Sequence, residues 1–428
     1  MKVLYIGDNR NRGSNWGCRA TSKALKDLIS RGNNVFYTIY GDVIARHIFY
    51  FESKKGVFVN RGGRTDKIIK LSVQLFSKFL SVKRLQKFTD FTDENVDKSM
   101  KKFIKKAKYN FLYKEMLEKA KECDAVILNG EGSFIFSTPH RRDTIFYLMI
   151  LKTAQQMNKK NYLVNAMFSD CHKSNRNVNV LKQATDIMSK CTLVVARDMD
   201  SYNYINQFDH SINLKYVPDA LFSWTKYENY IYNLLQFPTA LIPSPEYDKY
   251  WDNFDFTQPY ICISGSSSAA WNQKDARLGY IELVQSLKEY NYKLFIVPTC
   301  GGDRFLYEVA DQTNIPVIPV NTNILAGMAI LANAAVFISG RWHPSILASL
   351  GGTPCIIFGS NSHKTISFLN MMDYDKKREY NAIPDKKEIP FILNDIQDYI
   401  QQGIILRNKI KRKAKELSEL TDFYKNIQ

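Results

Sequence analysis

Short apolar runs alternate with longer amphipathic stretches along most of the chain. An apolar run at 1–7 is followed by a helical pattern at 18–30 and a second apolar run at 35–39, which is the spacing of a strand-helix-strand unit. The alternation returns between residues 125 and 217, with predicted strands at 125–129, 162–166, 193–196 and 214–217 and predicted helices at 143–157, 179–189 and 198–207. This rhythm predicts a parallel sheet covered by helices on both faces, as in a Rossmann-like domain.

A second series of the same kind follows. It has predicted strands at 260–264, 294–298, 317–320, 336–338 and 355–358, and predicted helices at 277–289, 304–313 and 324–333. We therefore predict an α/β protein with two Rossmann-like domains facing a cleft, an N-terminal one at 1–222 and a C-terminal one at 259–393. Residues 223–258, rich in aromatics and prolines, are expected to form a linker and flap, and residues 394–428 to form helices that cross back.

One segment interrupts the first domain with a different pattern. Residues 54–122 carry 19 lysines and arginines against 8 acidic residues, which is most of the excess behind the net charge of +17. A possible hairpin near 48–59 is followed by helical patterns at 67–85 and 96–122. This basic helical insert either packs as ordinary solvated helices or lies on an anionic membrane surface. We do not expect a nucleic acid partner.

Length and composition limit the class of protein. A chain of 428 residues is long enough for two domains, and 45% hydrophobic residues with a mean hydropathy of -0.30 are typical of a soluble protein. No apolar run reaches 18 residues, and the chain opens directly into a strand, so we expect neither a membrane span nor a signal peptide and a cytoplasmic location. The seven cysteines are scattered without a CxxC pair, so we expect reduced thiols and no metal site.

The stretch from Val336 to Ile357 contains the strongest candidate site. A buried strand leads into the polar turn Ser339 to His343, and a helix is expected to begin at Pro344, because proline suits the first helical position. Arg341 and His343 then lie at the carboxyl end of a parallel strand beside a helix N-terminus, which favours anions. In the alternative interpretation Arg341 pairs with a surface carboxylate and His343 only caps the helix.

Other strand ends supply possible partners. Glu131 follows a predicted strand in Asn129-Gly130-Glu131-Gly132, where glycines allow a ligand to approach the backbone. Arg197 follows another strand, with Asp198 as the expected helix cap, and Lys364 follows the strand at 355–358. Arg197, Arg341, His343 and Lys364 would together suit a small, doubly anionic ligand.

These motifs, read in chain order, carry a family resemblance. Asn15-x-Gly17, Gly130-x-Gly132-Ser133, Arg197-Asp198, Pro218-Asp219 and the segment SGRWHPSILASLGGTPCIIFGSNSHKTISFL resemble the polysaccharide pyruvyl transferase family. The resemblance spans about residues 1–372 without the basic insert. It departs at Trp16-Gly17-Cys18, where the family more often has small and acidic residues. The family is similar in architecture to two-domain glycosyltransferases of the B type.

The resemblance implies transfer of pyruvate from phosphoenolpyruvate to two hydroxyls of a sugar, as a cyclic ketal. Arg197, Arg341 and Lys364 would then bind the donor, and His343 would protonate its methylene carbon, since histidine titrates near neutral pH. Glu131 is the candidate base for the sugar hydroxyl. The expected acceptor contacts are Asn15, Trp16, Asn129, Gly130 and His140. No cofactor or metal is expected, because phosphoenolpyruvate is a substrate and ketal formation needs no metal.

Two other functions remain open from the sequence. The same scaffold suits a nucleotide-sugar glycosyltransferase of polysaccharide synthesis, in which Arg341 and Lys364 would bind a diphosphate. A non-catalytic polyanion-binding protein would instead depend on the insert at 54–122. For the pyruvyl transferase, the insert would hold the enzyme at the inner face of the plasma membrane, next to a lipid-linked acceptor of a cell-surface polysaccharide.

Overall fold

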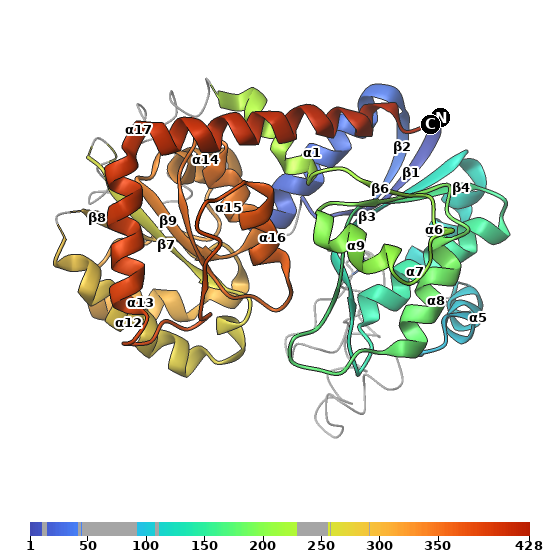
Figure 1. Cartoon of the computed structure of the whole chain (residues 1–428). Coiled ribbons are helices and arrows are strands. Elements are labelled where there is room, and N and C mark those ends of the chain that lie inside the picture. Colours follow the sequence, from blue (N-terminus) through green and yellow to red (C-terminus); the bar gives the residue numbers. More distant parts are fainter. Residues whose placement is uncertain are drawn as a thin grey trace, which may run out of the picture.

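The computed structural model describes residues 1–10, 15–41, 44, 92–107, 111–228, 256, 258–290 and 292–428. These residues form two parallel sheets, each with its own helices, that lie side by side (Figure 1). The predicted hairpin near 48–59, the predicted helix at 67–85 and most of the predicted flap at 223–258 fall outside the described residues.

The first sheet has the strand order β2-β1-β3-β4-β5-β6, and every neighbouring pair is parallel. Its strands are β1 (Lys2–Asp8), β2 (Asn34–Tyr40), β3 (Ala125–Phe136), β4 (Lys160–Asp170), β5 (Leu193–Ala196) and β6 (Leu214–Tyr216). Its helices are α1 (Trp16–Gly32), α5 (Val96–Lys106), α6 (Phe111–Glu122), α7 (Arg142–Gln156), α8 (Val178–Met188), α9 (Met199–Asn206) and the 3₁₀ helix η1 (Ala220–Tyr227). The pattern of 96–122, predicted as one helix, is thus divided between α5 and α6.

The second sheet has the order β11-β10-β9-β7-β8 and is also parallel throughout. Its strands are β7 (Tyr260–Ser266), β8 (Lys293–Ile296), β9 (Val336–Gly340), β10 (Cys355–Phe358) and β11 (Glu379–Tyr380). Its helices are η4 (Ala269–Trp271), α12 (Gln273–Lys288), η5 (Gly301–Asp303), α13 (Phe305–Thr313), α14 (Ile324–Asn333), α15 (Trp342–Ser349) and α16 (Lys364–Met371). The strand predicted at 317–320 is reduced to a single bridge between Val317 and Ile296. The helix predicted to begin at Pro344 begins at Trp342, so His343 lies within its first turn.

One long C-terminal helix joins the two halves. Helix α17 (Ile389–Leu420) first runs along the second sheet's domain and then turns across to α1, where η6 (Thr421–Asn426) ends the chain near its N-terminus (Figure 1). The turn lies at Gly403, whose φ of 49° and ψ of -125° are not helical. Glycine suits this position because it has no Cβ to oppose a positive φ.

Helix α1 is anchored in both domains. The Trp16 backbone N–H donates to Thr299 O (2.9 Å), and its indole Nε1 donates to Val320 O (2.8 Å). The Trp16 ring is fully buried and lies against Gly327, where an added Cβ would come within 2.5 Å of it. A buried tryptophan with a satisfied N–H contributes strongly to such an interface. The helix that begins the first domain is therefore also part of the second domain's core.

No helix in the described part of the chain is both long enough and apolar enough to cross a bilayer.

Candidate active site

The carboxylate of Asp219 lies where the two domains meet. Its Oδ2 accepts a hydrogen bond from Trp342 Nε1 (3.0 Å) and lies 3.2 Å from His343 Nε2 and 3.4 Å from Arg197 Nη1. Its Oδ1 accepts from the Thr21 hydroxyl at 2.7 Å. Burial alone would raise the pKa of Asp219, but His343 and Arg197 outweigh burial and hold the pKa well below its usual range. An ionised carboxylate thus connects side chains from both domains.

Arg197 reaches this carboxylate from the end of β5. Asp198 caps α9 as predicted, because its Oδ1 accepts from the Ser201 backbone N–H at 2.8 Å. The Arg197 guanidinium is only 2% exposed, lies 5.0 Å from the centre of the Trp342 ring and places Nη1 3.3 Å from His343 Nε2. Arg197 therefore crosses from the first domain to residues of the second.

His343 is fixed between Asp219 and helix α1. Its Nε2 faces Asp219 and Arg197, and its other ring nitrogen faces Gly17. A Cβ at position 17 would lie 2.5 Å from His343 Nδ1 and 2.6 Å from His343 Cβ. Glycine at position 17 is therefore required for the imidazole to lie here, which gives a physical reason for the Asn15-x-Gly17 motif.

Arg341 is oriented by a buried carboxylate. Its Nη2 donates to Asp303 Oδ1, and Asp303 Oδ2 accepts from the backbone N–H groups of Thr299 and Cys300. Asp303 is fully buried, whereas the Arg341 side chain is 15% exposed. The alternative in which Arg341 pairs with a surface carboxylate is wrong, because its partner lies in the interior of the second domain. The Nε atoms of Arg341 and Arg197 are buried and have no hydrogen-bond partner among the described residues.

Lys364 begins α16 and adds a third cation. Its Nζ donates to Asn361 Oδ1 at 2.7 Å, which supplies a dipole but no countercharge. Burial, followed by repulsion from Arg341, Arg197 and Arg141, lowers the pKa of Lys364 from 10.5 to about 7. Arg141 is itself held by Gly132 O (3.2 Å) and by an ion pair with Asp143. Cations from both domains are thus close enough to repel one another, which is the condition that an anionic ligand relieves.

Glu131 lies on a second, connected polar cluster. Its Oε1 accepts hydrogen bonds from Asn9 Nδ2 (2.7 Å), Ser22 Oγ (2.8 Å) and Asn129 Nδ2 (3.1 Å). In the described part of the structure, Oε2 has no hydrogen-bond partner. Glu131 is 6% exposed and has a φ of 41°, a left-handed conformation that is rare for a residue with a side chain. Such backbone strain often occurs at functional sites.

Asn165, at a similar bend in the neighbouring strand β4, joins this cluster to Asp219. Its φ is 54°, its Nδ2 donates to Thr21 Oγ1 (3.0 Å), and its Oδ1 accepts from the Ala220 N–H (3.1 Å). Thr21 in turn donates to Asp219. Asn165 Nδ2 also lies 3.5 Å from Asn129 Oδ1, so Thr21 and Ser22 of α1 belong to one continuous polar network.

Several predicted acceptor contacts need correction. Trp16 is not accessible to a ligand, because its ring is fully buried in the core that joins α1 to the second domain. Asn129 is 1% exposed, and its amide donates to Gly7 O and Glu131. Gly130 lies against Ala166, where an added Cβ would come within 2.5 Å. Asn15 uses its Oδ1 to cap α1 by accepting from the Cys18 N–H. Trp16, Asn129 and Gly130 are buried and build the frame of the site, whereas the half-buried Asn15 stays a candidate acceptor contact.

His140 is half-buried and directly precedes Arg141 in the loop between β3 and α7. Its position beside Arg141, which is electrostatically coupled to Lys364, keeps it as a candidate acceptor contact.

Three residues of the site were not predicted from the sequence: Asp219, Asp303 and Arg141. Asp219 had been noted only within the Pro218-Asp219 motif, and its partners lie up to 198 residues away in the sequence. Asp303 lies in the loop TCGGD and Arg141 in the loop STPHRRD, and neither loop has a recognisable motif. No local pattern indicated their contacts, because each contact forms between separate elements. Among the described residues, no group of three or more potential ligand side chains is arranged to hold a metal ion.

Comparison with solved structures defines the class of protein. The UDP-GlcNAc 2-epimerase of Neisseria meningitidis bound to UDP-GlcNAc is similar with a TM-score of 0.50 and 11% identity, over 98% of this chain and 99% of that one. The N-terminal domain of Candida albicans trehalose-6-phosphate phosphatase is similar with a TM-score of 0.52 and 10% identity, over 99% and 98% of the two chains. At these identities the likeness concerns the fold alone, which is the two-Rossmann, glycosyltransferase-B-like architecture.

The sequence identifies the family within this class. Residues 63–362, more than two thirds of the chain, match the polysaccharide pyruvyl transferase family. The chain belongs to this family and is a transferase. No curated protein sequence matches it.

Proposed function

We propose that the protein transfers the enolpyruvyl group of phosphoenolpyruvate to two hydroxyls of a sugar, forming a pyruvate ketal and releasing phosphate. The acceptor would be a cell-surface polysaccharide or its lipid-linked precursor. The observation that carries the proposal is the meeting of Arg197 with His343 at 3.3 Å, with Arg341 and Lys364 close enough to be coupled electrostatically. Cations from two domains around one point suit a ligand that is small and carries two anionic groups.

In this proposal the arginines and the lysine bind the donor. The carboxylate and phosphate of phosphoenolpyruvate would be held by Arg197 and Arg341, whose guanidinium groups form paired hydrogen bonds to such oxyanions. Lys364 would approach the phosphate and neutralise it as it departs. Because the half-buried lysine has a pKa of about 7 and no carboxylate partner in the described structure, a bound phosphate would also stabilise its charged form.

His343 is the proposed general acid. Protonation of the donor's methylene carbon turns it into a methyl group and leaves an electrophilic carbon next to the carboxylate. One sugar hydroxyl then adds to that carbon and loses its proton to a base, phosphate leaves, and the second hydroxyl adds in the same way to close the ketal. Asp219 would hold the imidazole in position and stabilise its protonated form, as carboxylates do for catalytic histidines.

Glu131 is the proposed base, acting through Oε2, since Oε1 is committed to three hydrogen bonds. His140, beside Arg141 in the loop before α7, is the proposed acceptor contact. The protein would act in the cytoplasm without a cofactor, and the basic segment 54–122 would hold it against the inner face of the plasma membrane. If that is so, removal of residues 64–90 should reduce sedimentation with anionic vesicles.

The direct test is incubation with phosphoenolpyruvate and a panel of galactosides, mannosides and glucosides. Phosphate release together with a mass gain on one sugar is the expected result. The second candidate is a nucleotide-sugar glycosyltransferase, favoured by the neighbour bound to UDP-GlcNAc. Thermal unfolding with each donor separates the two, because the true donor binds only the folded state and raises its melting temperature. Stabilisation by a nucleotide sugar and not by phosphoenolpyruvate would overturn the pyruvyl transfer proposal.

A further inference from the structure

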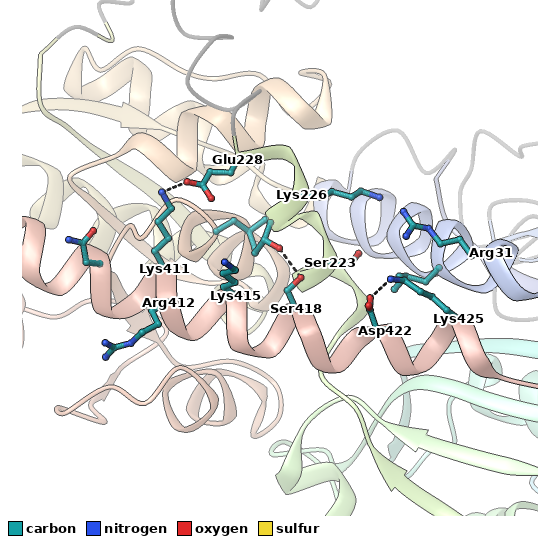
Figure 2. Close-up of a pocket in the computed structure, with 14 residues that line it drawn as sticks. Arg31, Ser223, Lys226, Glu228, Lys411, Arg412, Lys415, Ser418, Asp422 and Lys425 are labelled. Atoms are coloured by element: carbon teal, nitrogen blue, oxygen red, sulfur yellow. Dashed lines mark hydrogen bonds and ion pairs between the residues drawn. The ribbon is translucent and has the colours of Figure 1, made fainter.

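A basic groove lies where α1, η1 and α17 meet (Figure 2). Its volume is about 620 Å³, and none of the residues proposed above for catalysis or donor binding lines it. Six lysines and arginines line it against two acidic residues. They are Arg31, Lys226, Lys411, Arg412, Lys415 and Lys425, with Glu228 and Asp422 as the acids.

Two of the six cations are neutralised within the groove. Lys411 pairs with Glu228, and Lys425 pairs with Asp422 at 2.5 Å. These pairs lie at the two ends of the groove in Figure 2. Both acidic residues of the groove are therefore already paired. The remaining lysines and arginines between these two pairs are not neutralised by any acid of the groove.

Three exposed cations come from three different elements. Arg31 lies in the last turn of α1, Lys226 on η1 and Lys415 on α17. None of them forms an ion pair within the described part of the chain, and Lys226 only lies over the Tyr227 ring at 4.9 Å. In Figure 2, Lys415 projects from α17 toward η1, and Arg31 and Lys226 extend from neighbouring helices on the other side. Like charges brought together by tertiary structure, without countercharges, favour an anionic ligand.

A buried hydroxyl adds a neutral contact. Ser223 lines the groove, is 8% exposed, and its Oγ has no hydrogen-bond partner among the described residues. Buried polar groups are normally paired, so an unpaired one beside a cationic groove is consistent with a site for a hydrogen-bonding ligand. The Thr225 hydroxyl, by contrast, already pairs with Ser418 at 2.7 Å.

We propose that this groove is a second anion site, which binds a ligand bearing a phosphate or diphosphate group. Arg31, Lys226 and Lys415 line one cavity, and a phosphate or diphosphate group offers them more charge and more acceptor oxygens than a single carboxylate does. The ligand is either a soluble phosphate compound or the headgroup of an anionic lipid. The second source is relevant because Ile404 and Ile405, on the same helix, are 67% and 78% exposed. This second site does not depend on whether the donor in the candidate active site is phosphoenolpyruvate or a nucleotide sugar.

The position of the groove connects it to the cleft. Helix η1 begins directly after Asp219, whose Oδ1 accepts from the Leu221 N–H at 3.0 Å. Ser223 and Lys226 lie farther along the same short helix. An anion in the groove would therefore bind the helix that carries the central carboxylate of the candidate active site.

The test uses the full chain and inorganic pyrophosphate as the probe, measured by calorimetry. The double variant Arg31→Glu/Lys415→Glu should weaken binding at least about tenfold at physiological salt, because it replaces two attractions with two repulsions. Lys182→Glu, an exposed lysine on α8, is the matched control and should change affinity by less than about twofold. Arg341→Ala weakens any binding of pyrophosphate to the candidate active site and should leave binding to the groove in place.

A parallel measurement identifies the source of the phosphate. The same variants are sedimented with vesicles of phosphatidylcholine alone and of phosphatidylcholine with phosphatidylglycerol. Loss of vesicle binding in the double variant, with no pyrophosphate binding by the wild type, assigns the groove to a lipid headgroup. Loss of pyrophosphate binding assigns it to a soluble phosphate. The proposal is overturned if the wild type binds neither probe, or if the double variant, with an unchanged melting temperature, binds both as the wild type does.

Discussion

Two clusters of charge border the candidate active site, and they are built differently. In the Asp219 cluster (Asp219, Arg197 and His343) a buried carboxylate compensates the cation, and Arg197 is 2% exposed. In the Lys364 cluster (Lys364, Arg341 and Arg141) the lysine has only an amide as its polar partner, and its pKa is lowered to about 7. The first arrangement fixes geometry before any ligand arrives. In the second, the cations repel one another until an anion binds. Positioning thus depends mainly on the first cluster, and donor binding on the second together with Arg197.

The strongest way to break the Asp219 cluster is His343→Gln. Glutamine can still hydrogen-bond to Asp219 but cannot deliver a proton to carbon, so we expect kcat to fall about 10²–10⁴-fold, the usual contribution of a general acid. The affinity for phosphoenolpyruvate, which depends on Arg197, Arg341 and Lys364, should change little. Phosphate release measures the first quantity and calorimetry the second. A turnover within tenfold of the wild type would remove His343 from the chemistry.

Asp219→Asn tests whether the same cluster supports stability. The side-chain NH₂ of asparagine would face the N–H donors of Trp342, Arg197 and His343. The buried arginine would also lose its countercharge. We expect the free energy of unfolding to fall by about 3–5 kcal/mol. Because the folded-state pKa of Asp219 is depressed, the wild type's advantage is present above about pH 4 and is lost as the pH falls through the folded pKa. Urea unfolding at pH 7 and pH 3 measures both effects.

Asp422→Asn is the matched control, because that aspartate is 60% exposed and its ion-pair partner among the described residues is Lys425 alone. Its effect should stay within about 0.5 kcal/mol. Equal destabilisation by the two variants would mean that Asp219 has no special structural role.

Gly17→Ala tests how closely the position of the His343 imidazole must be maintained for catalysis. The new methyl group would lie 2.5 Å from His343 Nδ1, so the ring must move away from α1 and lose its present alignment with Asp219. A shift of about 1 Å can cost about 10²-fold in rate, and we expect a loss of this size in kcat. Gly132→Ala is the control, because nothing lies within 4 Å of a Cβ there. Similar kinetics for the two variants would contradict the packing argument.

The sequence predicted some members of both clusters and not others. Arg197, Arg341 and His343 lie just after strands and Lys364 at a helix start, as predicted, because a strand, a turn and a helix start are local patterns. The two parallel sheets followed from the same alternation. Asp219 was not recognised as the centre of its cluster, since its partners come from α1, β5 and α15. Trp16 was misassigned for a related reason, since its burial depends on the second domain packing against α1.

The smallest effect that we predict belongs to the Lys364 cluster and concerns pH. Above pH 7 the phosphate of the donor is fully ionised, since its second pKa is about 6. Lys364, with a pKa of about 7 in the free protein, must take up a proton when an anion binds beside it. The dissociation constant for phosphoenolpyruvate should therefore rise as the pH rises from 7 to 9, by at most about tenfold per pH unit. Calorimetry in buffers of different ionisation enthalpy should show the proton uptake directly. Lys364→Met should bind more weakly at pH 7 and without this pH dependence, and a variant that kept the wild-type slope would show that another group titrates.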